Sequence, residues 1–276
     1  MTETFISLLE KRVQDSSSLI CIGINPHSRD LPKPSAASAS DFCLDLVTQT
    51  APYTAAFMLN PANFEVFGVD YWTVLKQVVD AIYSESTRLG SMIPIILDAR
   101  HGDTESIAEA YVKSAYENLG VHCVTLNPYL GKDSIEPYIR NQERGVFLLS
   151  KTSNSGSMDI QNVLVLPTGS DSPMPLYMYI AFLAQEWNVN NNIGIVVGAA
   201  HPKIMSMIRA GVPYLWFLSS GVDTQSGELE LALKAGLRAD GKGMLIHVSS
   251  NIVRGVDTPA KAAKDLRDKI LNITAI

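Results

Sequence analysis

The stretch IILDARHGDT, residues 95–104, sets three consecutive hydrophobic residues directly before Asp98, Arg100, His101 and Asp103. A short apolar run of this kind is typical of a buried strand, and charged groups at its end are typical of a sheet edge. Two carboxylates, a guanidinium and an imidazole are also groups that move protons or bind anions. The segment therefore predicts a strand whose end carries a functional site.

Seven other short apolar runs have the same character and are spread along the chain. With 93–99 they make up the predicted strands, which are 19–25, 55–60, 121–127, 145–151, 193–199, 215–220 and 243–249. Between most of them lie longer segments with the apolar period of a helix. Eight buried strands alternating with helices predict an α/β fold, a parallel sheet closed into a (β/α)8 TIM barrel. An open doubly wound sheet is the alternative, but no G-x-G-x-x-G motif follows the first strand.

The composition indicates one globular domain. The chain has 276 residues, 46% hydrophobic and 18% charged, and no change of composition divides it, so residues 1–276 are expected to form a single domain. The Pro- and Ser-rich segments 26–41 and 170–175 are interpreted as surface loops. Residues 1–15 have the pattern of an amphipathic helix with internal charges, not that of a signal peptide.

Charge and the lack of a long apolar run favour a small-molecule ligand over a nucleic acid or a membrane. The cysteine pattern favours a cytoplasmic location. A net charge of −6 argues against nucleic acid as the main partner, because phosphate binding needs a basic surface. No apolar run approaches the length of a membrane span, so no membrane partner is expected. Cys21, Cys43 and Cys123 form no C-x-x-C pair and are interpreted as reduced thiols, not as metal ligands. No cofactor and no metal are predicted.

In barrels of this kind the reacting groups lie where strands end and the following loops begin. The candidate residues at these eight ends are Asn25, Met58, Asn60, Asp98, Arg100, Asp103, Asn127, Lys151, Ser153, Ala200, His201, Ser219, Ser220, His247 and Ser249. The charge cluster of the third strand is therefore expected on the functional rim.

Eight motifs, in order along nearly the whole chain, resemble those of the orotidine 5'-monophosphate decarboxylase family, in particular the form with a D-A-K-R-G-D signature. They are CIGINP (21–26), AAFMLNPANFEVFG (55–68), LDARHGDTESIAEAY (97–111), TLNPYLG (125–131), KTSNSGS (151–157), VVGAAHP (196–202), SGVDTQSGELE (220–230) and LIHVSSNI (245–252). One such motif alone is a weak signal, whereas eight in sequence are specific. The resemblance implies a single barrel and a homodimer whose subunits face each other across the rim.

The resemblance also implies functional residues. The family works with an alternating Lys-Asp-Lys-Asp array, in which a lysine protonates the carbanion left after carbon dioxide departs. Asp98 and Asp103 match the two carboxylates of that array. Ser153 matches a contact to the pyrimidine, and Gln225 matches a contact to the phosphate.

Other positions depart from the family pattern. Met58 stands where the first lysine is expected and Arg100 where the second is; Asn25 replaces an aspartate, and Ser250 replaces the phosphate-binding arginine. A thioether has no proton to give, and an arginine, which can pair with Asp98 and Asp103, is a poor proton donor. Loss of a charged phosphate contact costs about 2–4 kcal/mol of binding. These losses gather on one rim, which favours a pocket rebuilt by natural repurposing or by design.

Polar groups new to that rim suggest another chemistry. His247 is a candidate general base, with Ser219 or Ser220 as the nucleophile and Asp98 or Asp223 as the carboxylate that orients the imidazole. The alternative is a strand-end histidine bonded to a loop carbonyl, together with serines that act only as cap or turn residues.

Three hypotheses follow for function. The first is general-base or Ser/His nucleophilic chemistry, as in an esterase-like hydrolase, on a small apolar substrate. The second is decarboxylation of orotidine monophosphate by a site that tolerates the replacements. The third is a binder or scaffold without catalysis. In each case the expected ligand contacts are Asn25, Met58, Arg100, Ser153, Gln225 and Ser250.

Overall fold

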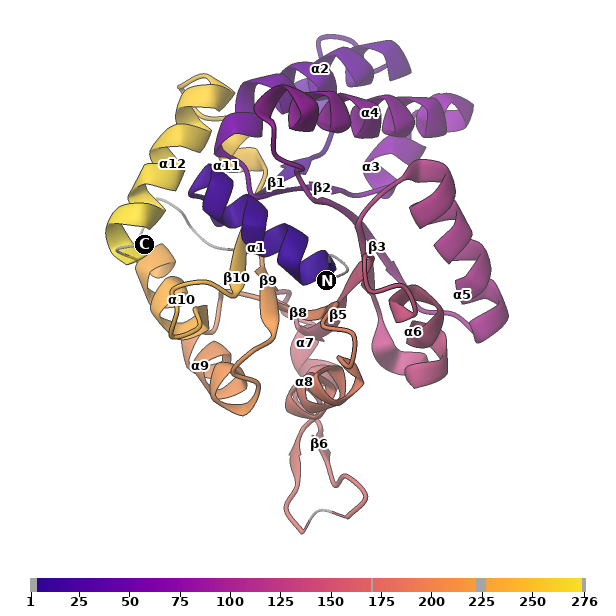
Figure 1. Ribbon diagram of the computed structural model, residues 1–276, viewed down its shortest axis with the longest axis vertical. Helices are drawn as coiled ribbons and strands as arrows, with labels where there is room; N and C mark the ends of the chain where they lie inside the picture. The colour runs from indigo at the N-terminus through magenta and orange to yellow at the C-terminus, as the bar shows by residue number, and fades with distance from the viewer. Residues whose placement is uncertain (1–3, 170, 222–226, 275–276) are drawn as a thin grey trace.

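Eight parallel strands close into a barrel, as predicted. The structure is a computed structural model that describes residues 4–169, 171–221 and 227–274. Around the barrel the strands follow the order β1-β10-β9-β8-β5-β4-β3-β2 (Figure 1). Their bounds are β1 Ile20–Ile24, β2 Ala56–Leu59, β3 Ile95–His101, β4 Cys123–Leu126, β5 Gly145–Lys151, β8 Ile193–Val197, β9 Trp216–Ser219 and β10 Met244–Val248. Seven of the predicted segments contain one of them, and β3 begins inside the eighth, 93–99, and ends two residues beyond it at His101.

Helices surround the barrel and cover its outer face (Figure 1). The longer ones are α2 Ala36–Thr50, α4 Tyr71–Leu89, α5 Glu105–Val112, α6 Lys132–Ile139, α8 Leu176–Trp187, α9 Pro202–Gly211, α10 Glu228–Gly236 and α12 Pro259–Thr274. In α4 the residues Val74, Val78 and Ile82 are buried, because their spacing of four places them on one helix face. The helix ends at Leu89 and is followed by Gly90, whose left-handed conformation suits a residue without a Cβ atom.

Short helical segments complete the connections between the longer elements. They are η1 Ser28–Asp30, η2 Ala51–Tyr53, α3 Ala62–Glu65, η3 Gly68–Asp70, η4 Lys113–Leu119, η5 Pro128–Leu130, α7 Ser157–Gln161 and α11 Ser250–Val253. The segment η4 continues α5 as a π-helix.

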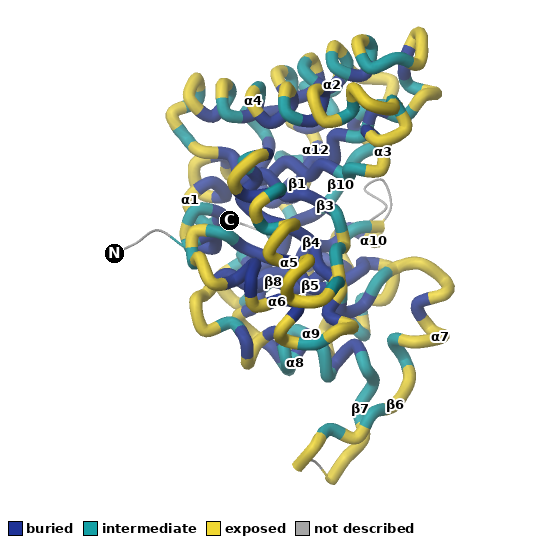
Figure 2. Tube along the Cα trace, turned by 90° about the vertical axis from the view of Figure 1, so that its right-hand side faces the viewer, coloured by how far each residue is buried: buried dark blue, intermediate teal, exposed yellow. Residues whose placement is uncertain are grey.

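The helix α1, Phe5–Ser16, closes the end of the barrel at which the strands begin (Figures 1 and 2). Thr4 and Ser7 cap it reciprocally, each side chain accepting from the other residue's backbone N–H group. Phe5 packs edge-on against Phe147 at 6.3 Å between ring centroids and occupies the space beside Gly145. This end is therefore filled by side chains, and the opposite end, where the strands finish, is left for a site.

Two features differ from the sequence prediction. The segment 26–41 is not a loop throughout, because it contains η1 and the first turns of α2, whose cap Ser35 accepts from the backbone of Ser38. A small antiparallel hairpin of β6, Leu164–Val165, and β7, Met174–Pro175, extends away from the barrel (Figures 1 and 2). It was not predicted, since strands of two residues are too short to show an alternating pattern.

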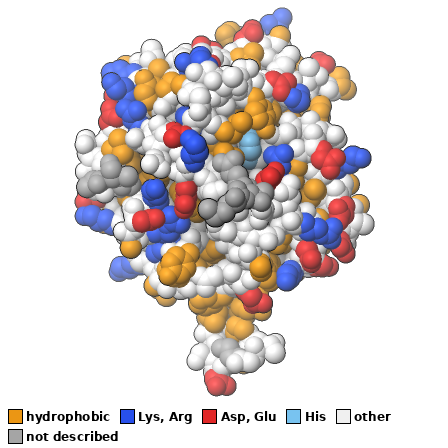
Figure 3. Space-filling model, in the orientation of Figure 1, with side chains coloured by type: hydrophobic (Ala, Val, Ile, Leu, Met, Phe, Trp, Pro, Cys, Tyr) orange, Lys and Arg blue, Asp and Glu red, His pale blue; other side chains and the backbone are white. Residues whose placement is uncertain are grey.

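The surface around α1 carries mixed charge. Figure 3 shows acidic and basic side chains next to each other across this face, and hydrophobic side chains gathered where the hairpin leaves the barrel. Val163, Leu164 and Leu166 are among the exposed apolar residues of that region. None of the helices in the described ranges is both long and apolar enough to cross a membrane.

Candidate active site at the barrel mouth

Asp98 is the centre of the site. It lies near the end of β3, is only 7% exposed, and its carboxylate accepts hydrogen bonds from three neighbouring side chains. The Thr125 hydroxyl donates to Oδ1 at 2.9 Å, and the Asn60 amide donates to Oδ2 at 3.3 Å. The Arg100 guanidinium donates to both oxygens at 3.2 Å. A buried carboxylate with a cation beside it is an arrangement that can act on a charged ligand.

Arg100 reaches Asp98 because the strand is irregular between them. Its φ of 52° lies in the left-handed region. For a residue other than glycine this conformation is strained by about 1–3 kcal/mol. The pairing of β3 with β4 shifts register between Leu97 and His101, and the Arg100 N–H group donates to Thr125 Oγ1 at 3.0 Å. Thr125 therefore holds both the carboxylate and the backbone that turns the guanidinium toward it.

The neighbouring strands supply amide and thioether groups, not amines. Met58 on β2 is buried opposite Gly23 of β1. At the mouth, Asn25 donates to Ser249 Oγ at 3.2 Å and accepts from the Asn63 amide at 3.0 Å. Asn25 is thus tied to both adjacent connections and has its main polar groups engaged.

His247 lies beside this centre on β10. Burial lowers its pKa to about 4, an effect that Asp98 opposes and Arg100 reinforces, so the imidazole is neutral at pH 7. Its Nε2 atom is inaccessible and has no hydrogen-bond partner among the described residues. A Cβ atom on Gly23 would lie 2.6 Å from Nε2, so the imidazole occupies space that the glycine leaves open.

The two candidate serines of β9 are not arranged as a nucleophile and base. Ser219 is fully buried, and its Oγ atom, like His247 Nε2, has no partner, so the structure contains no Ser219–His247 hydrogen bond. Ser220 is half-buried at the strand end. The hydrogen bond that such a pair requires is absent, and Ser219 is closed to a ligand in this arrangement.

The remaining predicted residues lie further out. Ser153 is exposed after β5 and packs close to Gly221, whose added Cβ atom would lie 3.2 Å from Ser153 Oγ. Asp103 accepts from the Thr104 N–H group at 2.8 Å, and the expected ion pair between Asp103 and Arg100 is not formed. Ser250 is exposed and donates to Asn251 Oδ1 at 3.3 Å. The other two candidates, Asp223 and Gln225, lie outside the described residues.

Thr125 is the site residue that sequence reasoning missed. In β4, the strand that carries it, the only strongly polar side chain is this threonine, and a single threonine in an apolar strand is a weak sign of a site. A signal was nevertheless present, since Thr125 is two positions before Asn127 and side chains two apart share a strand face.

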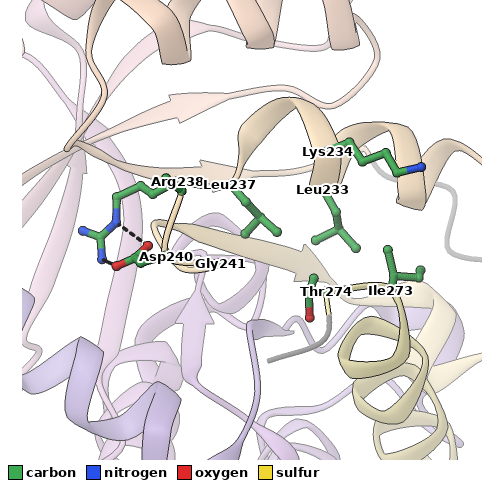
Figure 4. Close-up of a pocket in the computed structure, with 9 residues that line it drawn as sticks. Leu233, Lys234, Leu237, Arg238, Asp240, Gly241, Ile273 and Thr274 are labelled. Carbon is green, nitrogen blue, oxygen red and sulfur yellow. Dashed lines mark hydrogen bonds and ion pairs between the residues drawn. The ribbon is translucent and has the colours of Figure 1, made fainter.

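The cavity with the largest volume among those found in the described residues contains none of these groups. It has a volume of about 610 Å³ and lies between α10 and the end of α12, where Leu233 and Leu237 face Ile273 and the Arg238–Asp240 ion pair is at the side (Figure 4). In the described ranges, no cluster of three or more His, Cys, Asp or Glu side chains could hold a metal ion. The charged centre at the mouth is therefore the candidate active site.

Fold and site together define a (β/α)8-barrel protein whose mouth holds a buried carboxylate paired with a guanidinium. Comparison with known proteins places it more closely. The family model described as "Orotidine 5'-phosphate decarboxylase / HUMPS family" matches residues 18–266. The chain therefore belongs to this family, as the eight motifs predicted.

Similar proteins match along their whole length. The orotidine 5'-phosphate decarboxylase of Roseiflexus sp. (strain RS-1) is 36% identical over 277 residues, covering 97% of either chain. That of Herpetosiphon aurantiacus is 34% identical, with 97% of this chain and 96% of the relative covered. Among solved structures, Leishmania donovani OMP decarboxylase is 41% identical, with a TM-score of 0.86, covering 99% of this chain and 100% of that one.

Proposed function

We propose that the protein decarboxylates orotidine 5'-monophosphate to uridine 5'-monophosphate, a step of pyrimidine biosynthesis, and does so slowly. Membership of the family and the names of its full-length relatives support the substrate. The observation that carries the proposal is the buried Asp98 carboxylate, which is paired with a cation where the resemblance expects a lysine.

Asp98 and Arg100 would divide the work between them. The bond between the pyrimidine ring and its carboxyl group breaks, and its electron pair stays on the ring carbon. A carboxylate of the substrate next to Asp98 is repelled, and this repulsion ends when neutral carbon dioxide leaves. The Arg100 guanidinium stabilises the carbanion and supplies the proton that forms the new C–H bond. Arginine holds its protons tightly, so protonation is slow.

Serine-dependent ester cleavage has less support. A nucleophile must be accessible and within hydrogen-bond reach of its base. Ser219 Oγ is buried without a bond to His247, and the full-length relatives compared above are named decarboxylases. We therefore favour decarboxylation over the hydrolase hypothesis.

The test is a decarboxylation assay with matched variants. Purified protein is mixed with orotidine 5'-monophosphate, the loss of its absorbance is followed, and uridine 5'-monophosphate is identified by chromatography. Asp98→Asn removes the buried charge, and we expect it to lower kcat/KM at least about 100-fold. Asp80→Asn removes an exposed charge on α4 and should leave the rate unchanged.

Two outcomes would contradict the proposal. If no uridine 5'-monophosphate forms above the uncatalysed rate, the protein is not a decarboxylase. Calorimetric titration with the substrate then distinguishes a binder, which gives saturable heat, from a scaffold, which gives none. Equal turnover by wild type and Asp98→Asn would remove Asp98 from the mechanism.

The quaternary structure and location are proposed on similar grounds. We infer a homodimer, because the resemblance implies one and because Tyr129 and Leu130, after β4, expose apolar side chains near the barrel mouth. A cytoplasmic location is supported by the buried, unpaired thiols of Cys21, Cys43 and Cys123.

A further inference from the structure

A small cavity lies on the outer side of β3, away from the barrel mouth. It has a volume of about 130 Å³ and is bordered by α3, α4, α5 and η4. Leu97 forms part of its wall, and Asp98 is the next residue along the strand. Because successive side chains of a strand point to opposite faces, this cavity is separate from the barrel mouth.

Aromatic rings make up much of the wall. Tyr71, Trp72, His101 and Tyr111 all line the cavity. His101 stacks on Tyr111 with 3.8 Å between ring centroids, and Tyr71 meets Trp72 edge-on at 6.3 Å. Trp72 and Tyr111 are 36% and 37% exposed, which places them where a ligand from solvent can reach them. The π faces of such rings carry partial negative charge, which attracts a cation.

The charges around the cavity favour a cation. Glu65 lines it, and this residue is exposed, so its carboxylate is accessible from solvent. The described lining residues include no lysine or arginine. His101 does not add positive charge at neutral pH, because burial lowers its pKa.

The backbone of η4 is adapted to the cavity. Ser114, Ala115 and Leu119 of this π-helical segment form part of the wall. A π-helical turn is rare in proteins and is found often at functional sites, since it widens the helix and displaces side chains. The segment thus adds the small side chains of Ser114 and Ala115 to a wall whose rings come from α4, β3 and α5.

We propose that this aromatic cavity binds the methylated ammonium group of a small organic cation. Cations that shed water easily are held by several aromatic faces at once, and a nearby carboxylate adds attraction. The volume equals that of roughly four water molecules, so it admits a compact head group and leaves any tail in solvent. This site does not depend on the proposed decarboxylation.

The test compares two probes of the same shape. Choline carries a trimethylammonium group, and 3,3-dimethyl-1-butanol carries a neutral tert-butyl group in its place. We expect choline to quench or shift tryptophan fluorescence saturably, with at least tenfold higher affinity than the neutral probe. Trp72→Leu should weaken choline binding at least fivefold by calorimetry, and Glu65→Gln at least threefold. Tyr214→Leu, an exposed aromatic on another face, is the control and should bind as wild type does.

The outcomes that overturn the proposal are distinct. Equal binding of choline and the alcohol would mean an apolar cleft without preference for charge. Absence of saturable choline binding, or unchanged affinity in Glu65→Gln and Trp72→Leu, would mean that the cavity is not a cation site. Circular dichroism of each variant shows whether it is folded, and Glu65→Gln, a surface change, tests the proposal even if Trp72→Leu is unfolded.

Discussion

At the scale of single residues, the geometry around Asp98 depends on Arg100 and Thr125. The left-handed φ of Arg100 is maintained because its backbone and its guanidinium are both bonded, to Thr125 and to Asp98 respectively. The guanidinium neutralises the carboxylate, and its side chain remains 55% exposed toward the mouth. The centre therefore alternates a carboxylate with a cation, as the family's array does, but the cation is a guanidinium and not an amine.

Restoring the two expected amines should raise decarboxylation. Met58 and Arg100 occupy the positions where the resemblance places lysines, and an ammonium group gives up its proton far more readily than a guanidinium. We expect the double variant Met58→Lys, Arg100→Lys to increase kcat/KM for orotidine 5'-monophosphate at least about 100-fold. The measurement is the same absorbance assay, with Met58→Leu as a control that changes shape without adding an amine. A double variant no faster than wild type would show that the amines are not the missing element.

His247 should make the fold sensitive to mild acid. Its pKa is about 4 in the folded protein, against 6.5 for an ordinary histidine, so the unfolded chain binds a proton more readily. The stabilisation is therefore complete above about pH 6.5 and is lost as the pH falls through 4. Between pH 7 and pH 5 the free energy of unfolding should fall by about 2 kcal/mol from this group. His122, with a pKa lowered to about 4 by burial, adds a similar loss.

Urea denaturation at the two pH values measures this effect. His247→Gln should remove about half of the decrease that the two histidines cause together, whereas His201→Gln, at an exposed helix cap, should leave it unchanged. An unaltered pH dependence in His247→Gln would argue that the imidazole is not buried in solution.

The sequence predicted the positions of the candidate residues better than their contacts. Strand ends could be recognised from apolar runs, and Asp98, Arg100, Asn25, Met58 and His247 lie at or near strand ends as expected, whereas their roles in a site stay a prediction. Whether Ser219 bonds to His247 depends on the relative height of two neighbouring strands and on side-chain rotamers. Neither is encoded in a spacing pattern, which is why the missing hydrogen bond could not be predicted.

At the scale of elements, α1 stabilises the barrel by filling the end at which the strands begin. We expect Phe5→Ala to lower the free energy of unfolding by about 3–5 kcal/mol, because it leaves a cavity beside Gly145 and Phe147 that the barrel cannot close. Leu8→Ala on the same helix, where the side chain is half-buried, should cost about 1 kcal/mol. Urea titrations of both variants provide the comparison, and equal losses would mean that α1 does not seal the barrel.

Elements whose apolar pattern continues over several residues could be predicted from the sequence, and very short elements could not. The helix α1 and the eight barrel strands follow from burial patterns that continue over several residues. The β6–β7 hairpin contributes two residues from each strand and projects into solvent, so no buried face marks it. The start of α2 was assigned to a loop for another reason, because its first turn is rich in Ser and Ala and lacks an apolar pattern.

At the scale of the whole molecule, the two ends of the barrel have different surfaces. The end covered by α1 is closed and carries mixed charge (Figure 3), whereas the opposite end holds the charged centre. The exposed Tyr129 is 82% accessible after β4, on the side of the site. Leu130, which follows it, is 43% exposed, so two neighbouring apolar side chains are accessible on this side.

A dimer that faces across the mouth should depend on this surface. We expect the protein to sediment as a dimer and Tyr129→Arg, alone or with Leu130→Asp, to shift it to a monomer, since each change buries a charge in an apolar contact. Tyr214→Arg is the matched control, because Tyr214 is 80% exposed in the connection before β9, at the end of the barrel away from the mouth. Analytical ultracentrifugation over a range of concentrations distinguishes the species. If Tyr214→Arg dissociates the dimer and Tyr129→Arg does not, the subunits meet at the closed end, and the two sites open to solvent independently.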